Sequence, residues 1–172
     1  MIVLGLDVGS AEIGIALLEV PPGAIAAVAR ERATMLGQGK LDIDATLAIL
    51  ASLQGRVDLV AIEPPGGVHP GLLRQRGAAA AMGVSKYASL GAKLAGRLMG
   101  HAEALGMRVV EIPATEWRRG LLGKANASNA AIAKALGYRI ALPAVTNADE
   151  RDAAKCALWG TIGLARCTIQ KH

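Results

Sequence analysis

The sequence is poor in aromatic residues and in cysteine. Only 2% of its 172 residues are aromatic, and phenylalanine is absent. A protein that stacks single-stranded bases on an aromatic platform is therefore disfavoured. The two cysteines, Cys156 and Cys167, match neither a disulfide framework nor a zinc site. We interpret them as small buried apolar residues in a reducing compartment.

Signals for export and for membrane insertion are also missing. The opening stretch MIVLGLDVG has no basic segment ahead of its apolar residues and no small-residue cleavage site, unlike a secretory signal peptide. No uninterrupted apolar run is long enough to cross a bilayer. We therefore expect a cytoplasmic protein that does not enter a membrane.

What the sequence does contain favours one folded domain. Hydrophobic residues make up 52% of the chain and charged residues 19%, which is enough apolar material for a core and argues against disorder. The length suits a single domain over residues 1–172. The net charge of +5 favours a polyanionic partner, with nucleic acid as one candidate.

The apolar segments alternate between strand and helix patterns. In chain order we expect strands over 1–7, 12–20 and 24–35, a loop over 37–40, a helix over 42–53 capped by Asp42 or Asp44, a strand over 57–63, a helix over 86–105, a strand over 107–112, and helices over 128–136 and 149–167. A strand-helix-strand connection requires parallel strands and a right-handed crossover. The pattern predicts an α/β fold with a mixed five-stranded sheet in the order 3-2-1-4-5, strand 2 antiparallel, and helices on both faces.

Four carboxylates are candidates for a metal site. Asp7 and Glu63 each end an apolar strand, and the predicted topology makes these two strands parallel neighbours. Ligands bind at this edge of open α/β sheets. Asp149 and Asp152 are three residues apart on a predicted helix and share one face of it. If that face turns toward Asp7, all four acids converge.

Such a cluster of partly buried carboxylates needs cations to offset its charge. Oxygen ligands without histidine or cysteine favour Mg²⁺ or Mn²⁺. Two such ions per active site would activate a water molecule and stabilise the leaving oxygen of a phosphodiester. Gly5 and Gly9, on either side of Asp7, would let a phosphate backbone approach closely, and Ser10 offers a hydroxyl and a backbone N–H.

Each acid also has an ordinary structural interpretation. Asp7 before Val-Gly-Ser is typical of a turn, and Glu63 before two prolines is typical of a solvated strand end. Asp149 suits a helix N-cap, and Asp152 suits the first helical turn. The active-site hypothesis depends on the convergence of the four residues, and hence on the predicted topology.

At these residues the chain resembles the RuvC family of Holliday-junction resolvases, within the RNase H-like superfamily. The resemblance follows four segments in order and spacing: VLGLDVGSAEIGIALLE (3–19), VDLVAIEPP (57–65), RVVEIPATEWRRGLLGKANASNAAIAKAL (108–136) and DERDAAKCAL (149–158). The first segment alone also resembles sugar kinases and actin-like ATPases. The compact chain is similar to bacteriophage-type members of the family.

The resemblance implies a homodimeric, Mg²⁺-dependent crossover junction endodeoxyribonuclease that nicks two opposed strands of a four-way DNA junction symmetrically. It matches Asp7, Glu63, Asp149 and Asp152 to the four metal-binding catalytic acids of the family. It matches Arg118 to a basic position near the scissile phosphate. The chain departs from the family after the motif glutamate, where an aromatic residue is usual and PPGGVHPG stands instead, with His69 as its only ring.

Basic residues in the segments that leave the same sheet edge are expected to contact DNA phosphates. They are Arg74, Arg76, Lys86, Arg118, Arg119 and Lys124. The alternatives are a non-catalytic junction-binding or RuvX (YqgF)-like protein and a nucleotide-binding domain of the actin and sugar-kinase type. All four carboxylates are present, which favours catalysis over the first. The second needs another phosphate motif and a second lobe, for which the chain has no room.

Overall fold

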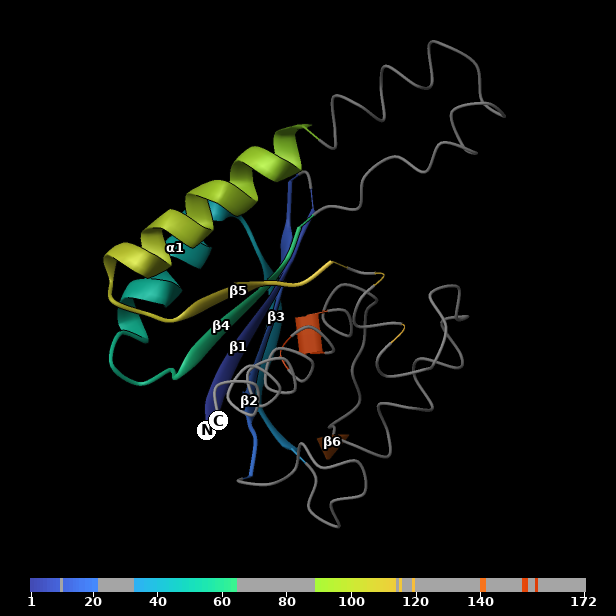
Figure 1. The fold of residues 1–172 in the computed structure, drawn as a ribbon, viewed down its shortest axis with the longest axis vertical. Coiled ribbons are helices and arrows are strands. Elements are labelled where there is room, and N and C mark those ends of the chain that lie inside the picture. Colours follow the sequence, from blue (N-terminus) through green and yellow to red (C-terminus); the bar gives the residue numbers. More distant parts are fainter. Residues whose placement is uncertain are drawn as a thin grey trace, which may run out of the picture.

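The structure, a computed structural model, describes residues 1–9, 11–21, 33–64, 89–113, 115, 119, 140–141, 153–154 and 157. Within these residues the chain forms one mixed β-sheet with helices packed against it (Figure 1). No helix in this part of the chain is long and apolar enough to span a membrane.

The described strands form a single sheet. They are β1 (Ile2–Val8), β2 (Ile13–Glu19), β3 (Ala33–Leu41), β4 (Leu59–Glu63), β5 (Val109–Glu111) and β6 (Ile140–Ala141). Their order in the sheet is β5-β4-β1-β2-β3-β6. β2 is antiparallel to both β1 and β3, whereas β4 is parallel to β1 and β5 is parallel to β4. The predicted order 3-2-1-4-5 with an antiparallel second strand is confirmed.

The strand β6 was not predicted. It adds two residues parallel to the first two residues of β3. Its sequence falls in the proline-containing segment between the helices predicted over 128–136 and 149–167, for which we predicted no element, and two residues are too few to show a strand periodicity. β6 lies at the edge of the sheet farthest from β5, so it leaves the central strands unchanged.

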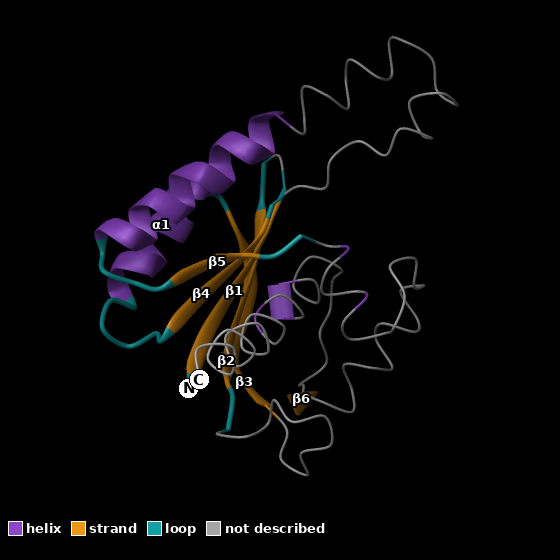
Figure 2. Cartoon of the chain, in the orientation of Figure 1, coloured by secondary structure: helices purple, strands orange, loops and turns teal. Residues whose placement is uncertain are grey.

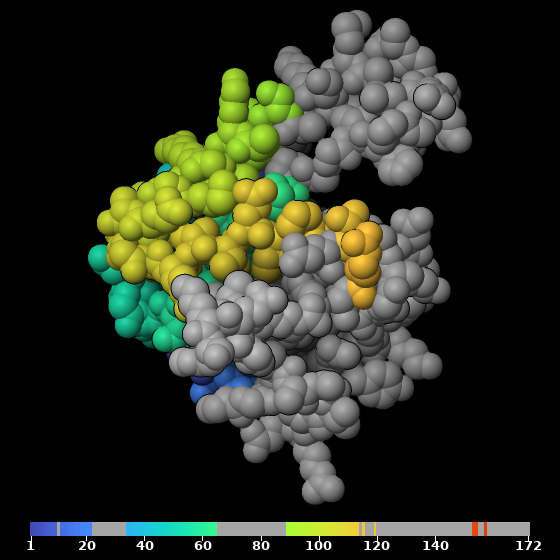
Figure 3. Space-filling view, in the orientation of Figure 1, coloured from blue at the N-terminus to red at the C-terminus, as the bar shows by residue number. Residues whose placement is uncertain are grey.

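One face of the sheet carries the large apolar core. Leu4 and Leu6 of β1 pack there with Leu50 of α1 (Ile43–Ser52) and with Leu98 of the helix over residues 89–104, and all four are at most 1% exposed. The two helices lie side by side on this face (Figure 1). The coloured surface in Figure 3 is made mainly by the longer helix and by β5 with its flanking residues.

Helical residues lie against the other face as well, as Figure 2 shows for the short segment at residues 153–154. These residues and residue 157 fall within the helix predicted over 149–167. The rest of that helix, and the helix predicted over 128–136, lie outside the described residues. The predicted placement of helices on both faces is confirmed for the part of the chain that the structure describes.

The third strand differs from its predicted position. We expected a strand over 24–35 and a loop over 37–40, but β3 runs over Ala33–Leu41 and includes both Gly37 and Gly39. Residues 24–32 lie outside the described part of the chain. The loop prediction was wrong because pairing with β2 outweighs the weak strand propensity of glycine. The ladder absorbs one extra residue as a bulge at Leu36, which has no partner between Leu17 and Leu18 of β2.

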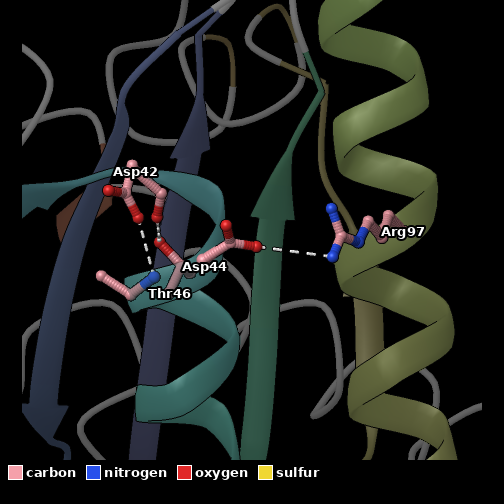
Figure 4. A network of polar contacts seen from close by, with 5 residues as sticks. Asp42, Asp44, Thr46 and Arg97 are labelled. Carbon is pink, nitrogen blue, oxygen red and sulfur yellow. Dashed lines mark hydrogen bonds and ion pairs between the residues drawn. The ribbon is translucent and has the colours of Figure 1, made fainter.

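The first helix begins at a well-defined cap (Figure 4). The carboxylate of Asp42 accepts a hydrogen bond from the backbone N–H of Ala45 at 2.8 Å, and the hydroxyl of Thr46 donates to the Asp42 carbonyl at 2.7 Å. Asp44 instead forms an exposed ion pair with Arg97 on the neighbouring helix, at 3.5 Å. Of the two predicted caps, the structure therefore assigns Asp42.

Replacing Asp42 by alanine should lower the free energy of unfolding by about 1 kcal/mol, because the first turn of α1 loses its side-chain acceptor. Urea denaturation followed by circular dichroism would measure this loss. Asp44→Ala serves as the matched control, since it removes an exposed ion pair of small value. If both variants lost the same stability, the assignment of the cap to Asp42 would be wrong.

Candidate active site

The two strand-end carboxylates lie side by side. Asp7 of β1 and Glu63 of β4 are direct partners in the parallel register, and both are at the carboxyl ends of their strands. Adjacent strands are about 4.8 Å apart, and directly paired residues project from the same face. The predicted adjacency of Asp7 and Glu63 is confirmed.

These carboxylates project from the face opposite the large apolar core. Side chains alternate along β1, so Asp7 shares a face with Val3 and Gly5, whereas Leu4 and Leu6 point into the core beneath α1. The row through Asp7 continues across the sheet. Asp7 is paired with Gly14 of β2, and Gly14 is paired with Lys40 of β3. The end of the sheet therefore presents carboxylates in its centre and a lysine toward β3.

The pair has a donor set that suits a hard divalent cation. Glu63 is only 6% exposed and Asp7 is half-buried, and each already has an interaction partner within the protein. A carboxylate that is buried to this degree must be compensated by hydrogen bonds or by positive charge. Carboxylate oxygens are the ligands that Mg²⁺ and Mn²⁺ prefer. The chemistry of the two residues therefore fits a metal ion of this class.

The other two predicted acids, Asp149 and Asp152, lie outside the described residues. Among the residues that the structure does describe, no group of three or more histidine, cysteine, aspartate or glutamate side chains is close enough to hold a metal ion. The described part of the site thus consists of one pair of carboxylates.

The helical residues on this face pack directly onto β1 at Gly5. A Cβ atom on Gly5 would collide with the carbonyl oxygen of Ala153 and would lie 2.8 Å from the Cβ of Ala157. The partners of Gly5 on the two neighbouring strands are Ala16 and Ala61, both fully buried. Small residues on three adjacent strands therefore let a helix backbone approach the sheet closely.

This packing corrects the expectation that Gly5 leaves room for a phosphate backbone. The space beside Gly5 is occupied by the protein's own helix. Gly9 is also explained locally, because its N–H donates to the carbonyl of Glu12 at 3.1 Å and a Cβ there would lie 2.7 Å from that oxygen. Gly9 closes the turn between β1 and β2.

Most of the predicted DNA-contacting residues lie outside the described residues: Ser10, Arg74, Arg76, Lys86, Arg118 and Lys124. Arg119 is described, and it is helical and exposed. The charged residues that sequence reasoning missed are Lys40 and Glu12, which form an ion pair at 2.9 Å near the turn that follows β1. Strand alternation would have placed Lys40 on the face of Asp7 if residues 37–40 had been assigned to a strand.

Comparison with known proteins identifies the architecture. No family model and no curated protein matches the sequence. Among solved structures, the chain is similar to Thermus thermophilus RuvC, with 20% identity, a TM-score of 0.67 and 98% of each chain covered. T. thermophilus RuvC in complex with a Holliday junction substrate gives 17% identity and a TM-score of 0.71 over 98% of this chain and 97% of that one. This chain has the RuvC fold.

A more distant relative in fold is the yeast mitochondrial Holliday junction resolvase Ydc2. It has 12% identity and a TM-score of 0.52, with 96% of this chain and 83% of the yeast chain covered. The RuvC fold agrees with the sheet order and the antiparallel second strand that the pattern of apolar segments predicted.

Within the RuvC fold, the contact at Gly5 should be sensitive to a single methyl group. We expect Gly5→Ala to lower the free energy of unfolding by about 1–3 kcal/mol, because the added Cβ meets backbone atoms that cannot turn away. Gly37→Ala is the matched strand control, since a Cβ there meets nothing within 4 Å and should be neutral or stabilising. Chemical denaturation measures both variants. Wild-type stability in Gly5→Ala would contradict the close packing.

Proposed function

We propose that this protein is a metal-dependent endonuclease that resolves four-way DNA junctions. The observation that carries the proposal is the register of β1 and β4, which pairs Asp7 with Glu63 at the carboxyl ends of adjacent strands. The RuvC fold supports it, because the similar structures include RuvC in complex with a Holliday junction substrate and a yeast Holliday junction resolvase.

In this proposal Asp7, Glu63, Asp149 and Asp152 hold two Mg²⁺ (or Mn²⁺) ions. Their oxygen-only chemistry favours this class of cation. Ala153, which follows Asp152 directly in the sequence, packs on Gly5, two residues before Asp7 on the same face of β1. Bound ions of this kind activate a water molecule and stabilise the leaving oxygen in phosphodiester hydrolysis. The burial of Glu63 restricts its side chain and thereby fixes the position of its carboxylate.

The proposed substrate is branched DNA, and the proposed active form is a homodimer. The net charge of +5 supports binding to a polyanion. Ser10, Arg74, Arg76, Lys86, Arg118, Arg119 and Lys124 are the proposed phosphate contacts, which give affinity without reading sequence. A two-fold dimer would present one active site to each of two opposed strands, and so would produce paired, symmetric nicks.

Cleavage of a synthetic four-way junction tests this function. We expect the protein to cut two opposed strands in the presence of Mg²⁺, to leave linear duplex of the same sequence uncut, and to lose activity when a chelator is added. Asp7→Asn should abolish cleavage and retain junction binding, because the change removes a metal ligand and leaves the phosphate contacts in place. Denaturing gels and mobility shifts measure the two properties.

Two results would contradict the proposal. Equal cutting of duplex and junction would show that the protein does not select four-way junctions over duplex DNA. Tight junction binding without any cleavage, under Mg²⁺ or Mn²⁺, would identify a non-catalytic junction-binding protein instead.

Metal binding has a separate test in thermal stability. A ligand that binds only the folded state stabilises it, by about 1.4 kcal/mol at ten times its Kd. We therefore expect Mg²⁺ to raise the Tm of the wild type, and to raise it less in Asp7→Asn and Glu63→Gln. Glu19→Gln is the matched control, because Glu19 is exposed at the opposite end of the sheet. The same rise in all four proteins would show that the ion binds elsewhere.

A further inference from the structure

A lysine extends the row of the two paired carboxylates. Asp7, Gly14 and Lys40 are successive partners across β1, β2 and β3, so they project from the same face of the sheet. Gly14 has no side chain to separate the other two. Strand spacing puts the backbones of Asp7 and Lys40 about 10 Å apart. The long, flexible side chain of Lys40 on β3 can therefore contact a group that is bound above the carboxylates.

The ammonium group of Lys40 leans toward the turn that follows Asp7. Its Nζ lies 2.9 Å from the Oε2 of Glu12, in the turn between β1 and β2. Glu12 is one of the partners of Lys40. The two side chains are 34% and 63% exposed, so the ion pair is at the surface and is accessible to an incoming phosphate.

We propose that Lys40 is a further DNA-contacting residue, whose ammonium group exchanges the Glu12 carboxylate for a phosphate of the strand bound at Asp7 and Glu63. This inference rests on the proposed nuclease function. An exposed ion pair contributes little to stability, so breaking it costs little. A phosphate oxygen is an equivalent charged acceptor for a lysine, and its binding releases counterions from DNA. Glu12 therefore acts as the competitor that holds Lys40 in place until DNA arrives.

The salt dependence of junction binding tests the contact without any cleavage. A labelled four-way junction is titrated with protein in a chelator at several salt concentrations. Loss of one phosphate contact should reduce the slope of log affinity against log salt by about 0.9 for each copy of Lys40 in contact. When the salt concentration is raised from 50 to 200 mM, the affinity of both proteins falls. For each lost contact, the factor by which the affinity of Lys40→Ala falls should be about threefold smaller than the factor for the wild type. Lys40→Arg should keep the wild-type slope.

Arg108→Ala provides the matched control for charge. Arg108 is exposed and immediately precedes β5, at the end of the strands opposite Asp7 and Glu63. Its removal changes the net charge by the same amount as Lys40→Ala. We expect Arg108→Ala to keep the wild-type salt slope. An equal fall in both variants would mean that the effect reflects net charge, and would overturn the proposal.

Substitution of Glu12 provides a second test, in which the junction affinity is expected to rise. Glu12→Gln should strengthen junction binding in the wild-type background, because it removes the competing carboxylate. It should have no effect in the Lys40→Ala background if it acts through Lys40. Glu19→Gln controls for the loss of one negative charge at the far end of β2. If the ion pair only braced the turn, both Lys40→Ala and Glu12→Gln would lower the Tm and leave the salt slope unchanged.

The outcomes separate this inference from the proposed function. A wild type that cleaves junctions, together with a wild-type slope in Lys40→Ala, would overturn the role of Lys40 and leave the nuclease assignment standing. A wild type that binds junctions no better than duplex would overturn both.

Discussion

The candidate site depends on the register between β1 and β4. Side chains alternate along a strand, so a slip of one residue would send Glu63 to the opposite face from Asp7. The start of the pair is held by two hydrogen bonds: the N–H of Ile2 donates to the Asp58 carboxylate at 2.7 Å, and the N–H of Asp58 donates to the Ile2 carbonyl at 2.9 Å. All five residues of β4 are buried, and a slip would move each of them away from its buried, paired position. Any slip is therefore disfavoured. An interaction at one end of the strands thus fixes the carboxylates at the other.

The two faces of the sheet are packed in different ways. On one face, large side chains such as Leu4 and Leu6 fill the space beneath α1 and its neighbouring helix. On the other, Gly5 lies between two alanines and admits a helix backbone to contact distance. Small residues bury less apolar area than large ones. The close approach of the helix compensates for this loss with additional dispersion contacts. The second face is also the one from which Asp7 and Glu63 project, so its close packing determines how near a helix comes to the carboxylates.

Strands with strong apolar runs were predicted from the sequence together with their order, because burial on both faces and the crossover rule leave few arrangements. The adjacency of Asp7 and Glu63 followed from that order. β3 was misplaced because glycines at 37 and 39 signal a loop locally, whereas their partners in the sheet are residues of β2 that lie twenty or more residues earlier. The role of Gly5 was misread for a similar reason. A glycine shows that something approaches closely, but the sequence does not show whether the approaching group is a ligand or the protein's own backbone. Lys40 was missed as a direct consequence of the loop assignment.

The misplaced strand matters because β3 supplies the positive side of the site. With β3 in place, the end of the sheet runs from a buried carboxylate on β4, through Asp7 and Gly14, to a lysine on β3. Such a row is polarised along the sheet edge. On the proposed assignment, cations would bind at the carboxylates and a phosphate of the same strand would contact the lysine, so the bound strand would cross β1, β2 and β3. In that arrangement the lysine would help to fix the position of the bound strand through its phosphate, without reading any base.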